Sequence, residues 1–232
     1  MKVEIYSDVV CPWCYIGERR FERALAGFEH VGEVEVEFRP FQLDPDAPAE
    51  SIPLKSYLAR RFGGSADGML RNVSDAAGGE GISIDWENAK AVNTRDSHRL
   101  LELASREYGR GVQRSLLEHL FAAHFSEGGD VGDLDCLTEL GVAAGMDEER
   151  VKGYLESGEG AEELTQELER ARSLGIRAVP AFLFEGKYVI EGAQPSSTFL
   201  QVLEEVQQRL EHEKGDPVDA DCDDGVCAAR EG

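Results

Sequence analysis

The hydrophobic pattern at the start of the chain changes from that of a strand to that of a helix and back. Apolar and polar residues alternate in Val3–Tyr6 and again in Glu33–Phe38, which predicts two strands, the second with a charged face in water. Between them, apolar residues from Phe21 to Phe28 recur at i, i+3, i+4 and i+7, the spacing of one helix face. This β-α-β order favours a parallel pair of strands.

The middle of the chain has only helical periodicity. Prolines interrupt regular structure between residues 40 and 53, and from 54 to 156 apolar residues recur at helical spacing between glycine-rich loops. No repeat of fixed period is visible. We therefore expect a compact, all-helical segment.

Strand signals return near the C-terminus. Ala181–Phe184 and Lys187–Ile190 flank Glu185–Gly186, which predicts a hairpin with a two-residue turn, and a last amphipathic helix follows over 199–210. These patterns predict an α/β fold in which one sheet domain, residues 1–45 and 165–213, is split by a helical insertion over 46–164. Residues 214–232 are expected to form a mobile acidic tail.

Charge and hydropathy narrow the choice of partners and compartment. The chain of 232 residues has 46 acidic and 24 basic residues, a net charge of -22, which disfavours binding to nucleic acid or to anionic membranes. No apolar run is long enough for a membrane span, and no signal peptide pattern follows Met1. We therefore expect a cytoplasmic protein, whose paired cysteines have a catalytic role rather than a structural one.

The cysteines Cys11 and Cys14 stand between the first predicted strand and the first predicted helix. Pro12 suits the first helical position, so Cys11 should lie at the N-terminus of the helix and Cys14 one turn further in. Exposed N–H groups and the helix dipole stabilise a thiolate there, which favours thiol–disulfide exchange. Half of a zinc site and a pair of core cysteines are the alternatives. A second C-x2-C pair, which a zinc site of that kind would use, is missing.

Several motifs together resemble one known family, the DsbA-type thioredoxin-fold proteins, and within it the FrnE-type branch, which is predominantly cytoplasmic. The motifs are Cys11-Pro12-Trp13-Cys14-Tyr15-Ile16-Gly17, Asn93-Thr94 followed by Ser97-His98-Arg99, Val179-Pro180, and Gly192-Ala193-Gln194-Pro195. The resemblance implies a thioredoxin fold with a large all-helical insertion. It also implies a dithiol–disulfide oxidoreductase that needs no metal or organic cofactor, with Cys11 as the attacking thiol and Cys14 as the resolving thiol.

The same resemblance implies a substrate surface around the cysteines. Val179-Pro180 matches the family's cis-proline loop, which would accept an extended protein or peptide substrate by strand addition; a trans proline at a strand start is the alternative. Trp13, between the cysteines, is expected to contact the substrate, as is Pro12. The partners would be disulfide-containing substrates and a thiol reductant such as glutathione or a thioredoxin system.

Two other functions remain open. The related 2-hydroxychromene-2-carboxylate isomerases and kappa-class glutathione transferases typically carry a serine at the position of Cys11, so the cysteine here argues against a glutathione-dependent enzyme of small aromatic acids. A redox- or zinc-regulated binding protein would use Cys11 and Cys14 together with Cys222 and Cys227 as four thiolates.

The tail holds a further pair, Cys222 and Cys227, with Gly225 available to turn the chain between them. A short flexible loop can bring two Cα atoms within about 7 Å. FrnE-type proteins can carry such a C-x4-C tail, so the resemblance supports a second redox pair that exchanges disulfides with Cys11 and Cys14.

Four other side chains are expected to have structural roles. His98 and His124 stand at predicted helix ends, where a histidine is commonly a dipole partner or a surface group. Asp8 has the character of a turn residue, and Cys136 that of a small core residue.

Overall fold

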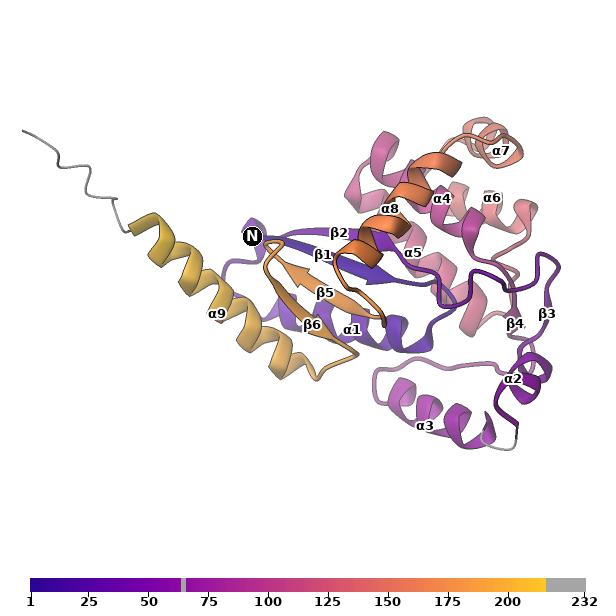
Figure 1. The fold of residues 1–232 in the computed structure, drawn as a ribbon, viewed down its shortest axis with the longest axis horizontal. Helices are drawn as coiled ribbons and strands as arrows, with labels where there is room; N and C mark the ends of the chain where they lie inside the picture. The colour runs from indigo at the N-terminus through magenta and orange to yellow at the C-terminus, as the bar shows by residue number, and fades with distance from the viewer. Residues whose placement is uncertain (64–65, 216–232) are drawn as a thin grey trace, which may run out of the picture.

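The central sheet combines strands from both ends of the chain (Figure 1). A computed structural model describes residues 1–63 and 66–215, without the side chains of 214 and 215. Its four-stranded sheet has the order β2-β1-β5-β6. The strands are β1 (Lys2–Ser7), β2 (Glu35–Pro40), β5 (Ala181–Phe184) and β6 (Tyr188–Glu191). β1 and β2 are parallel, as predicted, and the other pairs are antiparallel.

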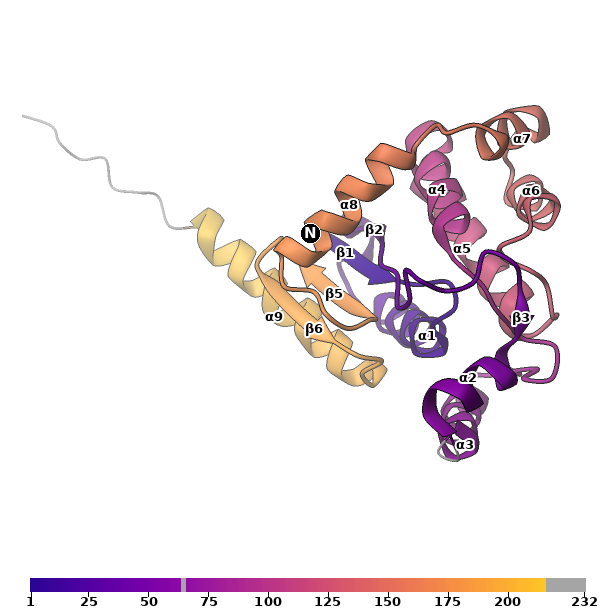
Figure 2. The same ribbon diagram turned by 45° about the vertical axis from the view of Figure 1, so that its right-hand side comes forward.

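Helices cover both faces of this sheet (Figure 2). On one face lie α1 (Pro12–Ala26) and α9 (Ser196–Gly215), which pack against each other. Their contact centres on Phe21, whose ring lies 5.2 Å from that of Phe182 and 5.5 Å from that of Phe199. On the other face lies α8 (Ala161–Ser173). The result is a helix–sheet–helix sandwich with apolar contacts on both sides of β1.

The segment between β2 and α8 is helical, as predicted, apart from one short ladder. The ladder pairs β3 (Ile52–Pro53) with β4 (Lys90–Ala91). The backbone just before the first helix of the insertion therefore lies beside the backbone that follows its second helix. A π-helical turn over Ala104–Tyr108 links α4 to α5. The helices are α2 (Leu54–Phe62), α3 (Ala66–Gly78), α4 (Arg95–Leu103), α5 (Arg110–Phe125), α6 (Leu134–Ala143) and α7 (Glu148–Glu156). They lie at the end of the sheet toward which β1 points (Figure 1).

Two details of the predicted strands are wrong. β2 begins at Glu35 rather than Glu33, because Val31–Glu33 forms a 3₁₀ turn closed by a bond from the Val34 N–H to the Val31 carbonyl. The hairpin loop has three residues rather than two, because Phe184 pairs with Tyr188 and leaves 185–187 between the strands. Both errors move a strand boundary and leave the strand order unchanged.

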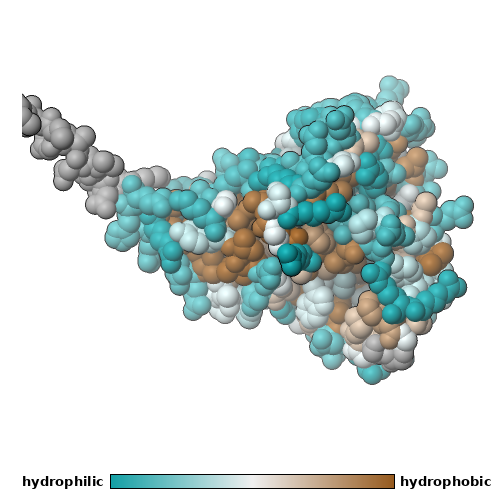
Figure 3. Space-filling model, viewed as in Figure 1, coloured by the Kyte–Doolittle hydropathy of each residue, from teal (hydrophilic) through white to brown (hydrophobic). Residues whose placement is uncertain are grey.

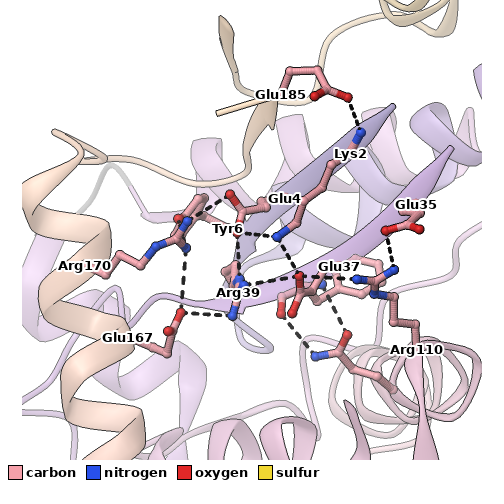
Figure 4. Close-up of polar contacts among 12 residues, drawn as sticks. Lys2, Glu4, Tyr6, Glu35, Glu37, Arg39, Arg110, Glu167, Arg170 and Glu185 are labelled. Atoms are coloured by element: carbon pink, nitrogen blue, oxygen red, sulfur yellow. Dashed lines mark hydrogen bonds and ion pairs between the residues drawn. The ribbon is translucent and has the colours of Figure 1, made fainter. Parts of the chain in front are cut away.

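The charged face of β2, expected in water, is only partly exposed, because the side chain of Glu35 is 63% exposed whereas those of Glu37 and Arg39 are 15% and 17% exposed. Glu4 is 3% exposed and accepts hydrogen bonds from Arg39 and from Arg170 of α8, at 3.0 Å each (Figure 4). Arg39 also donates to Glu167 of α8 at 3.1 Å. α8 therefore attaches to the sheet through ion pairs as well as through apolar contacts.

Hydrophilic residues dominate the face in Figure 3, and apolar residues gather in a few patches toward its middle. In the part of the chain that the structure describes, no helix has the length and apolar character needed to span a membrane.

Candidate functional site

Cys11 lies at the N-terminus of α1, where β1 has ended and the helix begins. Its backbone is extended, and its carbonyl accepts the first intrahelical bond, from the Cys14 N–H at 3.0 Å. Pro12 takes the first helical position, where the missing N–H costs nothing. The first turn carries no acidic residue that would oppose a thiolate. Cys11 is 3% exposed, so the protein covers most of the sulfur.

Cys14 lies deeper, with 2% of its surface exposed. Burial raises the pKa of this thiol well above its ordinary value, and Cys11 raises it further. The backbone N–H of Asp8 and the side chain of Ser7 hydrogen-bond to it and act in the opposite direction. Cys14 is therefore protonated at neutral pH and must lose a proton before it can attack a disulfide.

The loop before β5 faces the cysteines. The Cys11 sulfur lies 3.8 Å from the Val179 carbonyl oxygen, and the Val179–Pro180 peptide bond is cis. The Pro180 carbonyl accepts a hydrogen bond from the Gly192 N–H at 2.8 Å, which connects this loop to the end of β6. Residues 168 positions apart in sequence thus meet at the mouth of α1.

Gly17 allows α1 to approach this loop closely. A Cβ atom added at Gly17 would lie 2.9 Å from Cγ of Pro180 and 3.5 Å from Cα of Ala193. Arg20, one turn on from Gly17, donates to the Ala193 carbonyl at 2.6 Å and to Glu80 at 2.6 Å. The glycine of the first motif and the Gly-Ala-Gln-Pro segment are therefore parts of one contact.

A pocket of about 240 Å³ opens beside the residues that precede Cys11. Its walls come from the 43–47 loop, α2 and the 90–94 segment, and they mix apolar side chains with a few polar ones. The apolar lining includes Val10, Leu43, Leu54, Leu58 and Val92. Trp13 is half-buried, as is Pro12. The mouth of α1 thus has an apolar recess within reach of an extended chain.

Asp8 and His98 form a buried pair that the sequence did not reveal. Nε2 of His98 lies 3.2 Å from Oδ1 of Asp8, and Oδ2 of Asp8 accepts from the Leu43 N–H at 2.8 Å. Both side chains are at most 2% exposed, so His98 is not a surface group. The Asp8 carbonyl also accepts from the Cys11 N–H at 3.0 Å. Asp8 turns the chain, as expected, and also links the cysteine loop to α4.

Glu18, one turn after Cys14 on α1, is a second side chain that the sequence did not single out. It is 3% exposed, and neither carboxylate oxygen has a hydrogen-bond partner among the described residues. Burial, then the charges of Glu22 and Glu118, raise the pKa of Glu18 well above its ordinary value. The helical pattern gave no sign of this, because a glutamate on a long amphipathic helix is usually exposed.

The other two singled-out side chains differ from expectation in burial. His124 is fully buried, has no hydrogen-bond partner in the described structure, and its pKa is lowered by burial to about 4. It is therefore neutral and not a surface group. Cys136 is half-buried rather than a full core residue, and burial raises the pKa of its thiol.

Cys222 and Cys227 lie outside the described residues. Within residues 1–63 and 66–215, no group of three or more histidine, cysteine or acidic side chains is arranged to hold a metal ion. A four-thiolate site would depend on the two tail cysteines.

Comparison with known proteins identifies the family. The DSBA-like thioredoxin domain matches residues 2–204. The chain belongs to the DsbA-like thioredoxin family. Among the curated proteins of this kind, the uncharacterized protein YwbO of Bacillus subtilis is 29% identical over 218 residues, which cover 89% of this chain and 98% of YwbO.

Solved structures agree with this placement. A "probable DsbA oxidoreductase" from Streptomyces coelicolor is 36% identical, with a TM-score of 0.83 and 90% of each chain covered. The cytosolic disulfide reductase DsbM from Pseudomonas aeruginosa shares the fold at 19% identity, with a TM-score of 0.61 over 90% of this chain and 100% of that one. A 2-hydroxychromene-2-carboxylate isomerase shares it at 17% identity, with a TM-score of 0.65 over 92% and 98%. The DsbA-like thioredoxin fold predicted from the motifs is confirmed.

Proposed function

We propose that this protein is a dithiol–disulfide oxidoreductase of protein substrates, with Cys11 as the attacking thiol and Cys14 as the resolving thiol. The observation that carries the proposal is the position of Cys11 at the N-terminus of α1, 3.8 Å from the Val179 carbonyl. A thiolate at that terminus is stabilised by unpaired N–H groups and the helix dipole. An extended substrate can bond to the same loop.

The exchange then proceeds in two steps. The Cys11 thiolate attacks a substrate disulfide, forms a mixed disulfide and releases one substrate thiolate. Cys14 loses its proton and attacks the Cys11 sulfur, which forms the Cys11–Cys14 disulfide and releases the second substrate thiolate. The substrate gains two electrons and the pair loses two. Oxidation of a substrate follows the same steps in reverse.

We propose that the substrate lies along the Val179–Pro180 loop, with Pro12 and Trp13 in contact with it. The Val179 carbonyl would accept a backbone N–H of the substrate by strand addition. The 240 Å³ recess beside Val10 would take an apolar side chain near the substrate cysteine. Such a surface suits an unfolded or extended polypeptide.

We further propose a cytoplasmic setting with glutathione or a thioredoxin system as reductant. The fold is shared with a cytosolic disulfide reductase whose structure was also solved with glutathione, and this likeness supports the proposal. The division into a thioredoxin-like domain (1–45 and 165–213), a helical insertion domain and a tail with a second redox pair, Cys222 and Cys227, is likewise proposed.

The test compares two activities in the full chain. Reduction of a protein disulfide should exceed glutathione-dependent isomerisation of a hydroxychromene carboxylate, and Cys11→Ser should abolish the first. Cys136→Ser is the matched control, because Cys136 lies on α6 and outside the site. A Cys11→Ser variant that retains protein disulfide reduction, or a wild type that isomerises the aromatic acid faster, would overturn the proposal.

A further inference from the structure

The buried thiol of Cys14 needs a proton acceptor during the resolving step, and the structure places few polar groups against it. Its hydrogen-bonding neighbours, besides Cys11, are the Asp8 backbone N–H and the Ser7 side chain. A backbone N–H donates and cannot take up a proton. A serine hydroxyl both accepts and donates, so it can pass a proton on. Ser7 is therefore the first group along a path by which the proton of Cys14 can leave the site.

Ser7 lines a small cavity between β1, β2, α4 and α5. The cavity has about 10 Å³ of space for the centre of a water-sized sphere, close to the minimum needed to hold one water molecule. His98 of α4 lines the same cavity, together with Arg39 and Glu102. A hydroxyl next to the resolving thiol and an imidazole thus face one space of single-water size.

His98 is prepared to receive a proton there. If Nε2 donates to Oδ1 of Asp8, at 3.2 Å, the ring has its free lone pair on Nδ1. Asp8 is itself held by the Leu43 N–H at 2.8 Å, so it orients the ring. A carboxylate in contact stabilises the imidazolium that would form.

The other charged or titratable groups around His98 do not replace it. Arg39 is already protonated and cannot accept a further proton, and it is paired with Glu4 and Glu167. Glu102 faces the cavity, and burial followed by the charge of Glu167 raises its pKa. His124, which lies near enough to Asp8 to feel its charge, has a pKa lowered by burial to about 4. Neither has the oriented partner that His98 has in Asp8.

We propose that His98, oriented by Asp8, accepts the Cys14 proton through the Ser7 hydroxyl when Cys14 resolves the mixed disulfide. This inference rests on the proposed function. The Cys14 S–H bond breaks, its proton passes by Ser7 and one cavity water to Nδ1 of His98, and the sulfur keeps the electron pair. That pair forms the bond to Cys11, and the bond from Cys11 to the substrate sulfur breaks. The departing thiolate takes up a proton from solvent, and His98 returns its proton when the disulfide is reduced.

The experiment separates the two chemical steps. Mixed-disulfide formation is measured by intact mass with a peptide disulfide in the Cys14→Ser background, and the resolving step by stopped-flow fluorescence with Cys14 present. His98→Gln retains an amide that can donate to Asp8 but has no site to hold a proton. We expect it to slow resolution at pH 7 by tenfold or more and to leave formation within twofold. Its resolution rate should rise in direct proportion to hydroxide from pH 6 to 8.5, whereas the wild-type rate levels off.

Ser7→Ala removes the hydroxyl from the path and leaves the imidazole in place, so it should slow resolution in the same way. If His98→Gln does not fold, the resolution rate of Ser7→Ala tests the proposal instead. Glu18→Gln tests the competing acceptor, since Glu18 is a buried acid one turn from Cys14. His119→Gln, at a half-buried histidine of α5 that does not line the cavity, is the matched control and should resolve within twofold of wild type. The proposal is overturned if Glu18→Gln slows resolution while His98→Gln and Ser7→Ala do not, or if none of the three does. Absence of a mixed disulfide on Cys11 would instead contradict the proposed function.

Discussion

Two glutamates, one on each side of the sheet, are buried to the same extent, but their pKa values are shifted in opposite directions. Glu4 on β1 and Glu18 on α1 are each 3% exposed. Burial raises the pKa of Glu4, but the Arg170 hydrogen bond and the charges of Arg170, Arg39 and Lys2 outweigh it and leave the pKa lowered. Glu18 has no hydrogen-bond partner in the described structure, and burial raises its pKa.

The difference distinguishes two regions: the contact between β1 and α8, where ion pairs stabilise the fold, and the surroundings of α1, which contain the reactive groups. Between β1 and α8, every charge that is buried is paired (Figure 4). Around α1, the structure holds a buried thiol and an unpaired buried carboxyl, both with raised pKa values, and close backbone contacts. Buried polar groups without hydrogen-bond partners lower the free energy of unfolding and tend to occur near functional sites.

The largest effect should come from the close contact on the α1 side. Gly17→Ala places a Cβ 2.9 Å from Cγ of Pro180 and pushes the Val179 carbonyl away from Cys11. We expect a loss of about 2–3 kcal/mol of unfolding free energy and a tenfold or greater fall in disulfide exchange. Urea unfolding and turnover check this.

Gly153→Ala on α7 is the matched control for that substitution. Its added Cβ meets no heavy atom within 4 Å, so it should stabilise the helix by about 0.5–1 kcal/mol and leave turnover unchanged. Equal effects at the two glycines would show that packing against the loop does not set the activity.

On the α8 side, Glu4→Gln should cost about 2 kcal/mol at pH 7, because two arginines lose a charged acceptor. The pKa of Glu4 is lowered in the folded state, so its contribution is complete above the unfolded pKa of about 4.3 and is lost as pH falls through the folded pKa. The difference between variant and wild type should therefore vanish in acid. The exposed Glu205→Gln serves as control, and a difference independent of pH would contradict the assignment.

Glu18→Gln should change the free energy of unfolding in the opposite direction to Glu4→Gln. The pKa of Glu18 is raised on folding, so its contribution is complete below about pH 4.3 and is lost as pH rises through the folded pKa. We expect the variant to equal wild type in unfolding free energy near pH 4 and to be the more stable of the two at pH 8. Urea titrations across that range check the sign, and a destabilised variant at pH 8 would mean that Glu18 is ionised and paired.

The smallest effect should come from Lys2→Met. Lys2 lies 3.5 Å from Glu4 and 3.2 Å from Glu37, but its side chain is 42% exposed. We expect a loss below about 0.5 kcal/mol, which disappears in 0.5 M salt. A loss as large as that of Glu4→Gln would show that Lys2, rather than the two arginines, provides most of the stabilisation of the Glu4 carboxylate.

Local patterns were sufficient for the four strands of the sheet, for the parallel pairing of β1 with β2 and for the cysteines at the mouth of α1. Alternation and helical spacing each predict a single strand or helix from its own residues, and Pro12 indicates a helix start without information from the rest of the chain. The same patterns missed His98 and Asp8, which meet across 90 residues, and the burial of Glu18. They also placed the whole charged face of β2 in water, because nothing in that strand records that Glu167 of α8 pairs with Arg39.

The most direct test of the account is to trap the reaction at its first bond. A full-length Cys14→Ser chain that also carries Cys222→Ser and Cys227→Ser, so that neither tail thiol can react, is mixed with a disulfide-linked peptide, and the adduct is mapped by mass spectrometry after digestion. The Cys11→Ser control chain carries the same two tail substitutions. The account predicts a single peptide joined to Cys11 in stoichiometric amount, and none in a Cys11→Ser chain. An adduct on Cys136, or no adduct on Cys11, would contradict it.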